Sequence, residues 1–203
     1  MYRFDIINGL IAKYGYKRYL EIGTQGDVCL LLVNCEYKVG VDPEPVEHKE
    51  ENSDEFWEMT SDDFFKQNKE KFDIIFIDGL HEYKQVRNDI GNALNYLSDG
   101  GTIVVHDCNP LEEKNQQVPM PHVQSWNGDV WKAWIFFRHL SSLYMFVVDT
   151  DQGCGIIRRG FQTPLDGKYD IDFEGFDKER KELLNLIDVE QWTNIIDAQT
   201  RDA

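Results

Sequence analysis

The fold of this chain is decided by Arg18-Tyr19-Leu20-Glu21-Ile22-Gly23-Thr24-Gln25-Gly26-Asp27. The first half of the stretch is apolar enough for the end of a buried strand, and its two glycines mark a turn. The apolar residues 28–33 then open a helix. A glycine turn between a strand and a helix lets the backbone approach a ligand, and the free N–H groups at the start of the helix point outward. The stretch therefore predicts a ligand site.

This turn differs from the dinucleotide fingerprint G-x-G-x-x-G, because Thr24 and Gln25 separate Gly23 from Gly26. Glu21 comes two residues before the first glycine. A carboxylate at that place suits a ligand with a cationic amine, which a pyrophosphate lacks. In an open parallel sheet the ligand lies beyond the carboxyl ends of the strands, where the strand order reverses.

Composition limits the class of protein. The chain has 203 residues, of which 41% are hydrophobic, so we expect one domain with a sizeable core. Its 21 Lys and Arg stand against 37 Asp and Glu, which gives a formal net charge of -16. Such a field repels phosphate, so we expect no nucleic-acid partner and no anionic membrane partner.

Several sequence features predict a cytoplasmic protein. No apolar run approaches the ~20 residues that span a bilayer, and residues 1–5 lack the basic-then-apolar layout of a secretory signal. The four cysteines form no C-x-x-C pair and no zinc-like spacing, so we expect reduced thiols.

Strands and helices alternate along the chain. The clearest buried strand is 72–78, a near-continuous apolar run typical of a parallel strand covered on both faces. The alternation predicts an α/β fold with a doubly wound, mostly parallel, seven-stranded sheet and an antiparallel edge hairpin. The expected strands are 18–22, 37–41, 56–60, 72–78, 102–107, 143–148 and 155–159, and the expected helices are 1–14, 27–34, 61–68, 83–97, 131–140 and 178–187.

Two parts are expected. Residues 1–160 form the domain that binds the ligand, and residues 161–203 form an acidic extension with one helix that packs on the same domain. Residues 108–129 are a long irregular segment, and loops of that length inside a compact domain tend to be lids or binding segments.

Acidic residues recur at the ends of the successive strands. Asp42 follows Gly23 by nineteen residues, near the spacing of a ribose-binding acid. Asp62 follows the third strand and suits an adenine amino group, while Asp78 and Asp107 close the next two strands. Any one of them is explained by helix capping. Four in succession favour a nucleoside site.

These features together resemble small class I S-adenosylmethionine-dependent methyltransferases, and within them the metal-dependent O-methyltransferases of sugars and catechols. The resemblance rests on Glu21-x-Gly23-x-x-Gly26, Asp42, 77–83 and 100–107, and covers residues 1–160. It implies a Rossmann-like methyltransferase fold with S-adenosylmethionine as the cofactor. The methionine part is then expected at Glu21, Gly23, Thr24 and Gly26, the ribose at Asp42 and the adenine end at Asp62.

The resemblance also implies a divalent metal such as Mg²⁺, held by Asp78 and Asp107. The third ligand departs from the pattern, because His106 and Cys108 flank Asp107 and neither is a hard oxygen donor. A set of Asp78, His106 and Asp107 suits Mn²⁺, Fe²⁺ or Zn²⁺ better. Alternatively no metal binds, and His81 or His106 acts as the general base. Catalytic roles are expected for Asp78, His81 and Asp107.

The acceptor is expected to contact the stretch 126–132, where indole rings flank an amide, an acid and a lysine. Trp126 and Lys132 are the predicted substrate residues, because they border the long loop. The alternative is that Asp129 caps a helix whose tryptophans, Trp134 above all, are core.

The sequence as a whole predicts a methyltransferase that moves a methyl group to a hydroxyl of a small molecule, with a sugar as one candidate acceptor. Whether the chain forms a homo-oligomer stays open. One alternative is a non-catalytic adenosyl-binding protein. Another is a nicotinamide-dependent oxidoreductase, which would need a full glycine-rich pyrophosphate loop.

Overall fold

The computed structural model describes residues 1–203 except 27, 45–51, 123–124, 168–170 and 199–203. The elements in chain order are α1 (Arg3–Tyr14), β1 (Arg18–Ile22), α2 (Val28–Leu32), β2 (Tyr37–Val41), β3 (Glu55–Trp57), α4 (Ser61–Gln67), β4 (Phe72–Ile77), α5 (Tyr83–Tyr96), β5 (Leu97–Val105), the 3₁₀ helix η1 (Glu113–Gln116), α6 (Val130–Arg138), β6 (Leu143–Val148), β7 (Cys154–Arg159), α7 (Phe173–Leu184), β8 (Leu186–Ile187) and α8 (Val189–Asp197).

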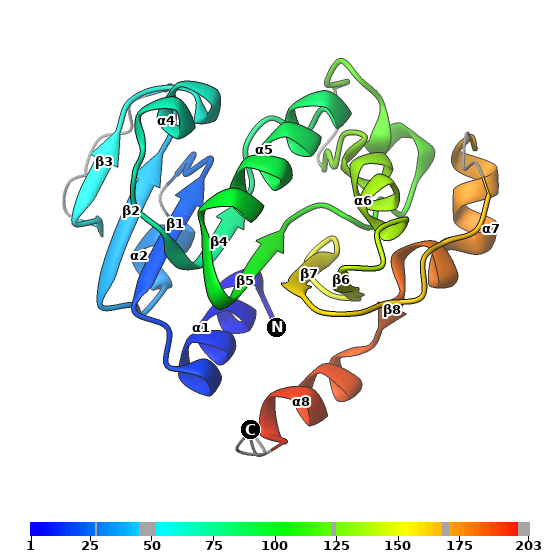
Figure 1. The fold of residues 1–203 in the computed structure, drawn as a ribbon. Coiled ribbons are helices and arrows are strands. Elements are labelled where there is room, and N and C mark those ends of the chain that lie inside the picture. The colour runs from blue at the N-terminus through cyan, green and yellow to red at the C-terminus, as the bar shows by residue number, and fades with distance from the viewer. Residues whose placement is uncertain (27, 45–51, 123–124, 168–170, 199–203) are drawn as a thin grey trace.

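The strands form one sheet in the order β3-β2-β1-β4-β5-β7-β6-β8 (Figure 1). The strands from β3 to β5 are mutually parallel, and β7 pairs antiparallel with both β5 and β6. This confirms the predicted doubly wound, mostly parallel sheet and its antiparallel hairpin. The strand order reverses between β1 and β4, so the carboxyl ends of these two strands bound the crevice in which such sheets bind ligands.

The sheet has one strand more than the seven predicted. Strand β8 is only two residues long and pairs in parallel with β6, so the hairpin does not form the edge of the sheet. Two apolar residues are too few to register as a strand in sequence. Asn185, which ends α7 in a left-handed conformation, turns the chain so that Leu186 and Ile187 reach the sheet.

Helices cover both faces of the sheet, as the apolar strands predict. On one face Ile6, Ile7, Leu30 and Trp192 pack from α1, α2 and α8. On the other face the core is completed by side chains of α4, α5, α6 and α7, including Phe64, Ile90, Trp131, Trp134 and Phe176. Burial on both sides explains why β4 is a continuous apolar run rather than an alternating one.

Several predicted boundaries shift. Helix α2 covers 28–32 rather than 27–34, with residue 27 outside the described part, and β3 covers 55–57 rather than 56–60. The predicted loop 44–54 falls largely on residues that the structure does not describe.

The segment after residue 160 contains more structure than predicted. Its first helix, α7, begins at Phe173 instead of residue 178, and the second helix, α8, was not predicted. Helix α8 packs against α1, where Ile196 lies beside Gly9 and Nζ of Lys13 donates to the Ile196 carbonyl at 3.1 Å. The extension therefore contacts residues 1–160 through both β8 and α8.

No helix among the described residues is long and apolar enough to cross a membrane.

Candidate active site

The glycine turn after β1 adjoins the end of β4. Gly23 has φ +83°, and a Cβ atom there would lie 2.3 Å from the backbone oxygen of Asp78. Only glycine allows this approach, so the glycine turn and Asp78, the first predicted catalytic acid, lie side by side at the candidate site. A Cβ atom at Gly26 would meet no heavy atom of the described residues within 4 Å. Thr24 is buried, and its hydroxyl oxygen has no hydrogen-bond partner among the residues that the structure describes.

Asp42 lies at the glycine turn, and its carboxylate braces the turn. Its Oδ2 accepts from the backbone N–H groups of Thr24 at 2.8 Å and Gln25 at 3.1 Å, while Oδ1 accepts from Glu44 N at 2.9 Å. The sequence predicts outward-pointing N–H groups here, but two of them turn toward Asp42. Asp42 therefore fixes the shape of the turn.

The other two predicted cofactor residues lie on different elements. Glu21 is buried, and one of its oxygens accepts from the hydroxyl of Tyr19 at 2.5 Å. Burial and the neighbouring Glu21 raise the pKa of Tyr19 well above its usual value, so Tyr19 keeps the donor proton. Asp62 lies in the first turn of α4 and contacts Gln85 of α5 at 3.4 Å. It lines a polar hollow of about 810 Å³ between these helices.

The predicted catalytic residues converge at the ends of β4 and β5. Nε2 of His81 lies 3.3 Å from Oδ1 of Asp78 and 3.3 Å from Oδ2 of Asp107. One ligand atom from each of the three residues lies within 4.8 Å of the other two. The structure thus brings Asp78, His81 and Asp107 together, although the first and last are 29 positions apart in the chain.

Both ring nitrogens of His81 have partners. Nδ1 lies 3.2 Å from the backbone oxygen of Trp126, which accepts only, so Nδ1 carries a proton and donates. Nε2 faces the two carboxylates. The indole ring of Trp126 stacks on the imidazole with 5.1 Å between the ring centroids, and Nε1 of Trp126 donates to Gln117 O. His81 is therefore held in one orientation.

Asp107 is held in a strained position. Its φ of +61° is rare for a residue other than glycine, and Asn127 Nδ2 donates to its Oδ1 at 2.9 Å. Such strain clusters at functional sites, where the surroundings enforce it. Gly128 allows the Asn127 loop to approach, because a Cβ atom there would lie 1.8 Å from the backbone oxygen of His81.

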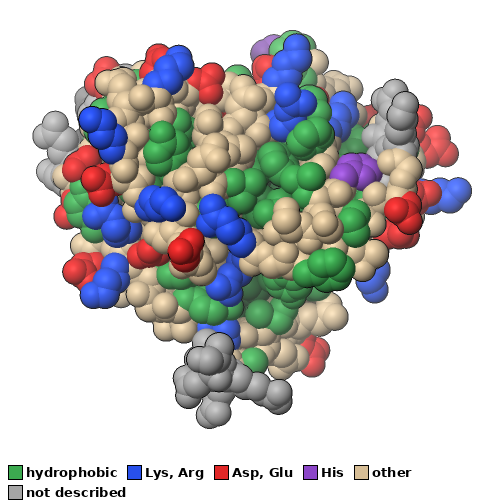
Figure 2. Space-filling view, in the orientation of Figure 1, with side chains coloured by type: hydrophobic (Ala, Val, Ile, Leu, Met, Phe, Trp, Pro, Cys, Tyr) green, Lys and Arg blue, Asp and Glu red, His purple; other side chains and the backbone are tan. Residues whose placement is uncertain are grey.

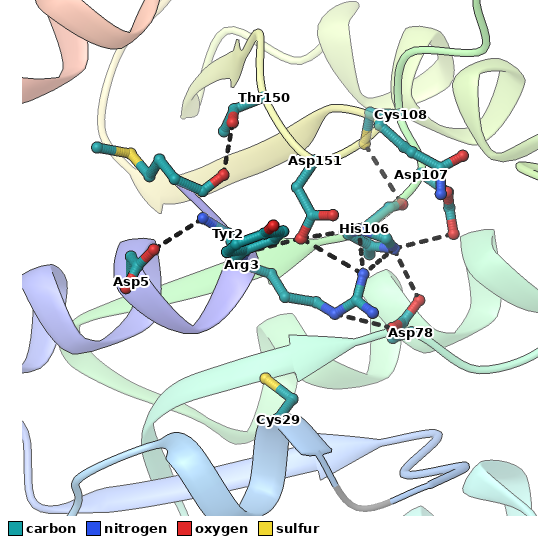
Figure 3. Close-up of polar contacts among 12 residues, drawn as sticks. Tyr2, Arg3, Asp5, Cys29, Asp78, His106, Asp107, Cys108, Thr150 and Asp151 are labelled. Carbon is teal, nitrogen blue, oxygen red and sulfur yellow. Dashed lines mark hydrogen bonds and ion pairs between the residues drawn. The ribbon is translucent and has the colours of Figure 1, made fainter.

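His106, a predicted metal ligand, contacts Arg3 as well as the two carboxylates. Its Nε2 lies 2.6 Å from Nη1 of Arg3, and its Nδ1 faces Asp107 at 2.9 Å and Asp78 at 3.1 Å (Figure 3). His106 therefore lies behind the carboxylates, with both nitrogens occupied. Two groups of side chains among the described residues could hold a metal ion: Asp78, His81 and Asp107 form one, and His106, Asp151 and Cys154 form the other.

The ionisable groups of the cluster shift one another's pKa values. Burial raises the pKa of Asp78, but the charge of His106 and the hydrogen bonds from His106 and His81 outweigh it and hold that pKa well below its usual value. Burial lowers the pKa of His81, while Asp78 and Asp107 raise it above its usual value overall. The two carboxylates thus attract positive charge to Nε2 of His81, whether that charge is a proton or a metal ion.

Three residues of the site were not predicted. Arg3 comes from the start of α1, Asn127 from the long loop and Asp151 from the turn between β6 and β7. Asn127 lies inside the stretch 126–132, which already stands out in the sequence for its aromatic and polar residues. Arg3 and Asp151 gave none, because a single basic or acidic residue in a helix or turn is ordinary on a protein surface.

Lys132, predicted to bind the acceptor, does not join this cluster. It pairs with Asp129 at 3.5 Å and lines a cavity of about 380 Å³ with Tyr83 and Trp131. Hydrophobic side chains gather over α6 beside it (Figure 2), and they include the exposed Phe136. Trp134 is fully buried, which agrees with its interpretation as core.

Comparisons with known proteins agree with the fold and the motifs. Residues 20–108 match a sequence family described as a methyltransferase domain. The structure resembles the Podospora anserina methyltransferase PaMTH1 bound to S-adenosylhomocysteine, with a TM-score of 0.61, 16% identity and 78% of each chain covered. It also resembles an O-methyltransferase from Bacillus cereus in complex with S-adenosylhomocysteine, with a TM-score of 0.55, 16% identity and coverage of 76% and 78%.

A third similar structure is the O-methyltransferase TomG from Streptomyces achromogenes in complex with S-adenosylmethionine, with a TM-score of 0.51, 16% identity and coverage of 75% and 76%. No curated protein sequence matches this chain. The matched domain and the shared fold confirm the predicted resemblance to class I S-adenosylmethionine-dependent methyltransferases. The match to a methyltransferase domain covers residues 20–108, and the solved structures, at 16% identity, show a shared fold.

Proposed function

We propose that this chain transfers the methyl group of S-adenosylmethionine to a hydroxyl of a small molecule, at the rim formed by the ends of β1, β4 and β5. One observation carries the proposal. The glycine turn at Gly23 touches the backbone of Asp78, and the side chain of Asp78 meets His81 and Asp107. A cofactor seated on the turn would therefore lie next to the groups that prepare the acceptor.

The glycine turn suits the cofactor. Within the described part of the chain, no atom obstructs a Cβ atom at Gly26, and the buried hydroxyl of Thr24 lacks a partner that a ligand would supply. Asp42 holds the turn in shape through Thr24 and Gln25, and in this proposal it also reaches the ribose. Glu21 below the turn contributes negative charge toward a cationic amine. Asp62 stays proposed for the adenine end.

The acid cluster suits a divalent metal ion. Two ligands at right angles and ~2.1 Å from an ion lie ~3 Å apart, close to the separations of His81 Nε2 from both carboxylates. The Nδ1–H of His81 donates to a backbone oxygen, the usual arrangement for a metal-binding histidine. We therefore propose Asp78, His81 and Asp107 as ligands, a set that favours Mn²⁺, Fe²⁺ or Zn²⁺.

This geometry favours His81 as a ligand over His81 as a general base. A base needs a ring nitrogen within reach of the acceptor's proton. Here Nδ1 already donates to Trp126 O, and Nε2 faces two carboxylates. When bound, the metal would supply Lewis acidity that lowers the pKa of the acceptor hydroxyl.

The protein's own residues orient the reaction. Methyl transfer forms a bond between the acceptor oxygen and the methyl carbon, breaks the bond from that carbon to sulfur and releases S-adenosylhomocysteine, while the hydroxyl proton passes to solvent water. Alignment of oxygen, carbon and sulfur supplies most of the acceleration. Trp126 covers His81 and would limit the access of water.

The acceptor is proposed to be small, with a sugar or catechol hydroxyl as the class to test. A net charge of -16 disfavours nucleic acid and anionic membranes as substrates. Trp126 stays proposed as an acceptor contact, because its ring lies over His81. Lys132 lies on a separate cavity and is a weaker candidate.

Calorimetry tests the cofactor and the metal together. S-adenosylmethionine, S-adenosylhomocysteine and NAD⁺ are each titrated into the protein with and without MnCl₂. We expect both adenosyl ligands to bind, NAD⁺ to show no binding and Mn²⁺ to bind with an affinity that Asp107→Ala abolishes. Transfer of labelled methyl from S-adenosylmethionine to a panel of glycosides and catechols then tests the reaction.

Two results would overturn this proposal. Binding of NAD⁺ in preference to S-adenosylhomocysteine would favour the alternative function, a nicotinamide-dependent oxidoreductase. Tight binding of S-adenosylhomocysteine, without Mn²⁺ binding and without methyl transfer to any acceptor of the panel, would favour a non-catalytic adenosyl-binding protein.

A further inference from the structure

Helices α5 and α6 border a cavity of about 380 Å³ whose walls are mostly apolar and aromatic. Its lining includes Tyr83, Trp131, Ile135, Phe136 and Ile171. Among the described residues that line it, none belongs to the acid cluster of the candidate active site. A cavity of this size with apolar walls and a few polar groups is typical of a site for a small molecule.

Aromatic rings give this cavity its shape. Phe136 leaves 43% of its surface exposed beside the cavity, although Trp131 and Trp134 of the same helix are buried. Tyr83, at the start of α5, adds a second partly exposed ring. Another aromatic ring packs well on such surfaces, either offset and stacked or edge to face. The cavity therefore suits a ligand that carries one or two aromatic rings.

Two cations lie beside these rings. Nζ of Lys132, which lines the cavity, is 5.5 Å from the centre of the Trp131 ring. The guanidinium of Arg87 on α5 is 5.0 Å from the ring centre of Phe136 and 5.7 Å from that of Tyr83. Figure 2 shows Lys and Arg side chains next to hydrophobic ones over α5 and α6. An occupant would thus meet positive charge at the edge of an aromatic cavity.

Both cations can take an anionic ligand. Lys132 pairs with Asp129 at 3.5 Å, but the lysine is half-exposed and Asp129 also accepts from Tyr83 N at 2.5 Å, so this ion pair is weak. Arg87 is exposed, and no carboxylate of the described residues forms an ion pair with it. The described lining residues include two bases, Lys132 and His139, and no acid.

We propose that this cavity binds an aromatic carboxylate, with its ring against Phe136 and Tyr83, its carboxylate at Nζ of Lys132, and Arg87 as a second cation at the rim. The net charge of -16 acts weakly here, because salt screens the wider field beyond ~8–10 Å and the two cations are nearer. This inference is independent of the proposed function, since it involves neither the cofactor nor a metal.

Calorimetry of the full chain, without cofactor or metal, tests the cavity with 2-naphthoate. Naphthalene-2-carboxamide keeps the rings and lacks the charge, while octanoate keeps the charge and lacks the rings. The variants are Lys132→Met and Phe136→Ala, with Lys17→Met as the control. Lys17 is likewise an exposed lysine in an ion pair, with Glu36 at 3.2 Å, but it precedes β1 and so lies at the other end of the sheet. Circular dichroism checks that each variant folds.

We expect the wild type to bind 2-naphthoate at least ~5-fold more tightly than either of the other two probes. Lys132→Met should bring the affinities for 2-naphthoate and its carboxamide to within about twofold, because only the carboxylate uses the lysine charge. Phe136→Ala should weaken the binding of both naphthalene probes by a similar factor, since both use the ring. Lys17→Met should match the wild type with all three probes.

Three results would overturn the inference. They are no binding of 2-naphthoate at millimolar concentrations, octanoate binding as tight as that of 2-naphthoate, and an unchanged preference for the carboxylate in Lys132→Met. Equal losses in Lys17→Met would also contradict it, since the effect would then come from the overall charge.

If a variant does not fold, NMR of the wild type decides. Nuclear Overhauser effects between 2-naphthoate and the ring protons of Phe136 and Tyr83 are then expected, and their absence would place the ligand elsewhere. Failure of these experiments leaves the proposed methyl transfer untouched, and failure of methyl transfer leaves these experiments valid, because they contain no cofactor and no metal.

Discussion

Nη1 of Arg3 lies 2.6 Å from Nε2 of His106, a residue 103 positions further along the chain. This contact makes helix α1 part of the candidate active site rather than only a cover for the sheet. His106 in turn faces the carboxylates of Asp78 and Asp107 through its Nδ1. The ligand set in the proposed function is Asp78, His81 and Asp107, one of two groups of possible ligands among the described residues.

Loss of the Asp107 carboxylate should abolish turnover and leave cofactor binding intact. Asp107→Ala removes one of the two carboxylates at the proposed metal position, so we expect methyl transfer to fall by at least ~100-fold, or ~2.7 kcal/mol in activation free energy. S-adenosylhomocysteine affinity should stay within about twofold. A fully active Asp107→Ala enzyme would exclude a central role for this residue.

Asp42→Ala should weaken the binding of S-adenosylhomocysteine by more than tenfold, ~1.4 kcal/mol or above. The variant loses the acceptor that braces the N–H groups of Thr24 and Gln25, as well as the proposed ribose contact. Asp54→Ala is the control, because Asp54 accepts from Lys38 N at the opposite end of β2. Calorimetry that finds equal affinities for the two variants would remove Asp42 from the cofactor site.

Gly128→Ala should disrupt the approach of the long loop to His81. A Cβ atom there would lie 1.8 Å from His81 O, and the φ of +57° adds ~1–2 kcal/mol of strain for an L residue. We expect a lower melting temperature and weaker Mn²⁺ binding. Gly91→Ala is the matched control within α5, where no described atom obstructs a Cβ atom, and it should stabilise by ~0.5–1 kcal/mol. A Gly128→Ala protein with wild-type stability would contradict the tight contact.

The stability of the fold should depend on pH through Asp89. Asp89 is buried on α5 and accepts from Gln85, and burial raises its pKa to about 6. Between about pH 4 and pH 6 the folded state therefore keeps a proton that the unfolded chain loses, so stability falls as pH rises through this window.

Asp89→Asn removes this titration. As the pH rises from 4 to 8, the free energy of unfolding of the variant should increase by ~2–3 kcal/mol relative to that of the wild type, as measured by urea unfolding. The exposed Asp99→Asn is the control and should follow the pH dependence of the wild type. If the free energy of unfolding depends on pH in the same way for Asp89→Asn and the wild type, burial does not shift the pKa of Asp89 and the prediction is wrong.

Much of the fold was predictable because its signals are local. The apolar run of β4, the glycine turn after β1 and the alternation with helices each act over a few residues, and parallel strands with covered faces follow from them. Strand β8 was missed because two apolar residues carry little signal. Helix α8 did have a signal that was overlooked, a capping box formed by Asp188 and Gln191 at the start of an amphipathic segment.

The candidate site was predictable in part. Asp78 and Asp107 end parallel strands that pair side by side, so their proximity follows from the topology alone. The choice between His81 and His106 did not follow. Both histidines lie near a strand-end acid in the sequence, and only the contacts of each ring nitrogen favour His81 as the proposed ligand.

The sequence by itself determined that the chain forms a mostly parallel sheet, that a glycine turn follows its first strand and that the acids lie at the carboxyl ends of the strands. Each of these features depends on the period and composition of short segments. The tertiary structure alone decided that Arg3 and Asp151 reach this end of the sheet and that Asp42 turns toward the backbone of the turn. Such contacts join residues distant in the chain, and their formation depends on how α1 and the β6–β7 hairpin pack against the finished sheet.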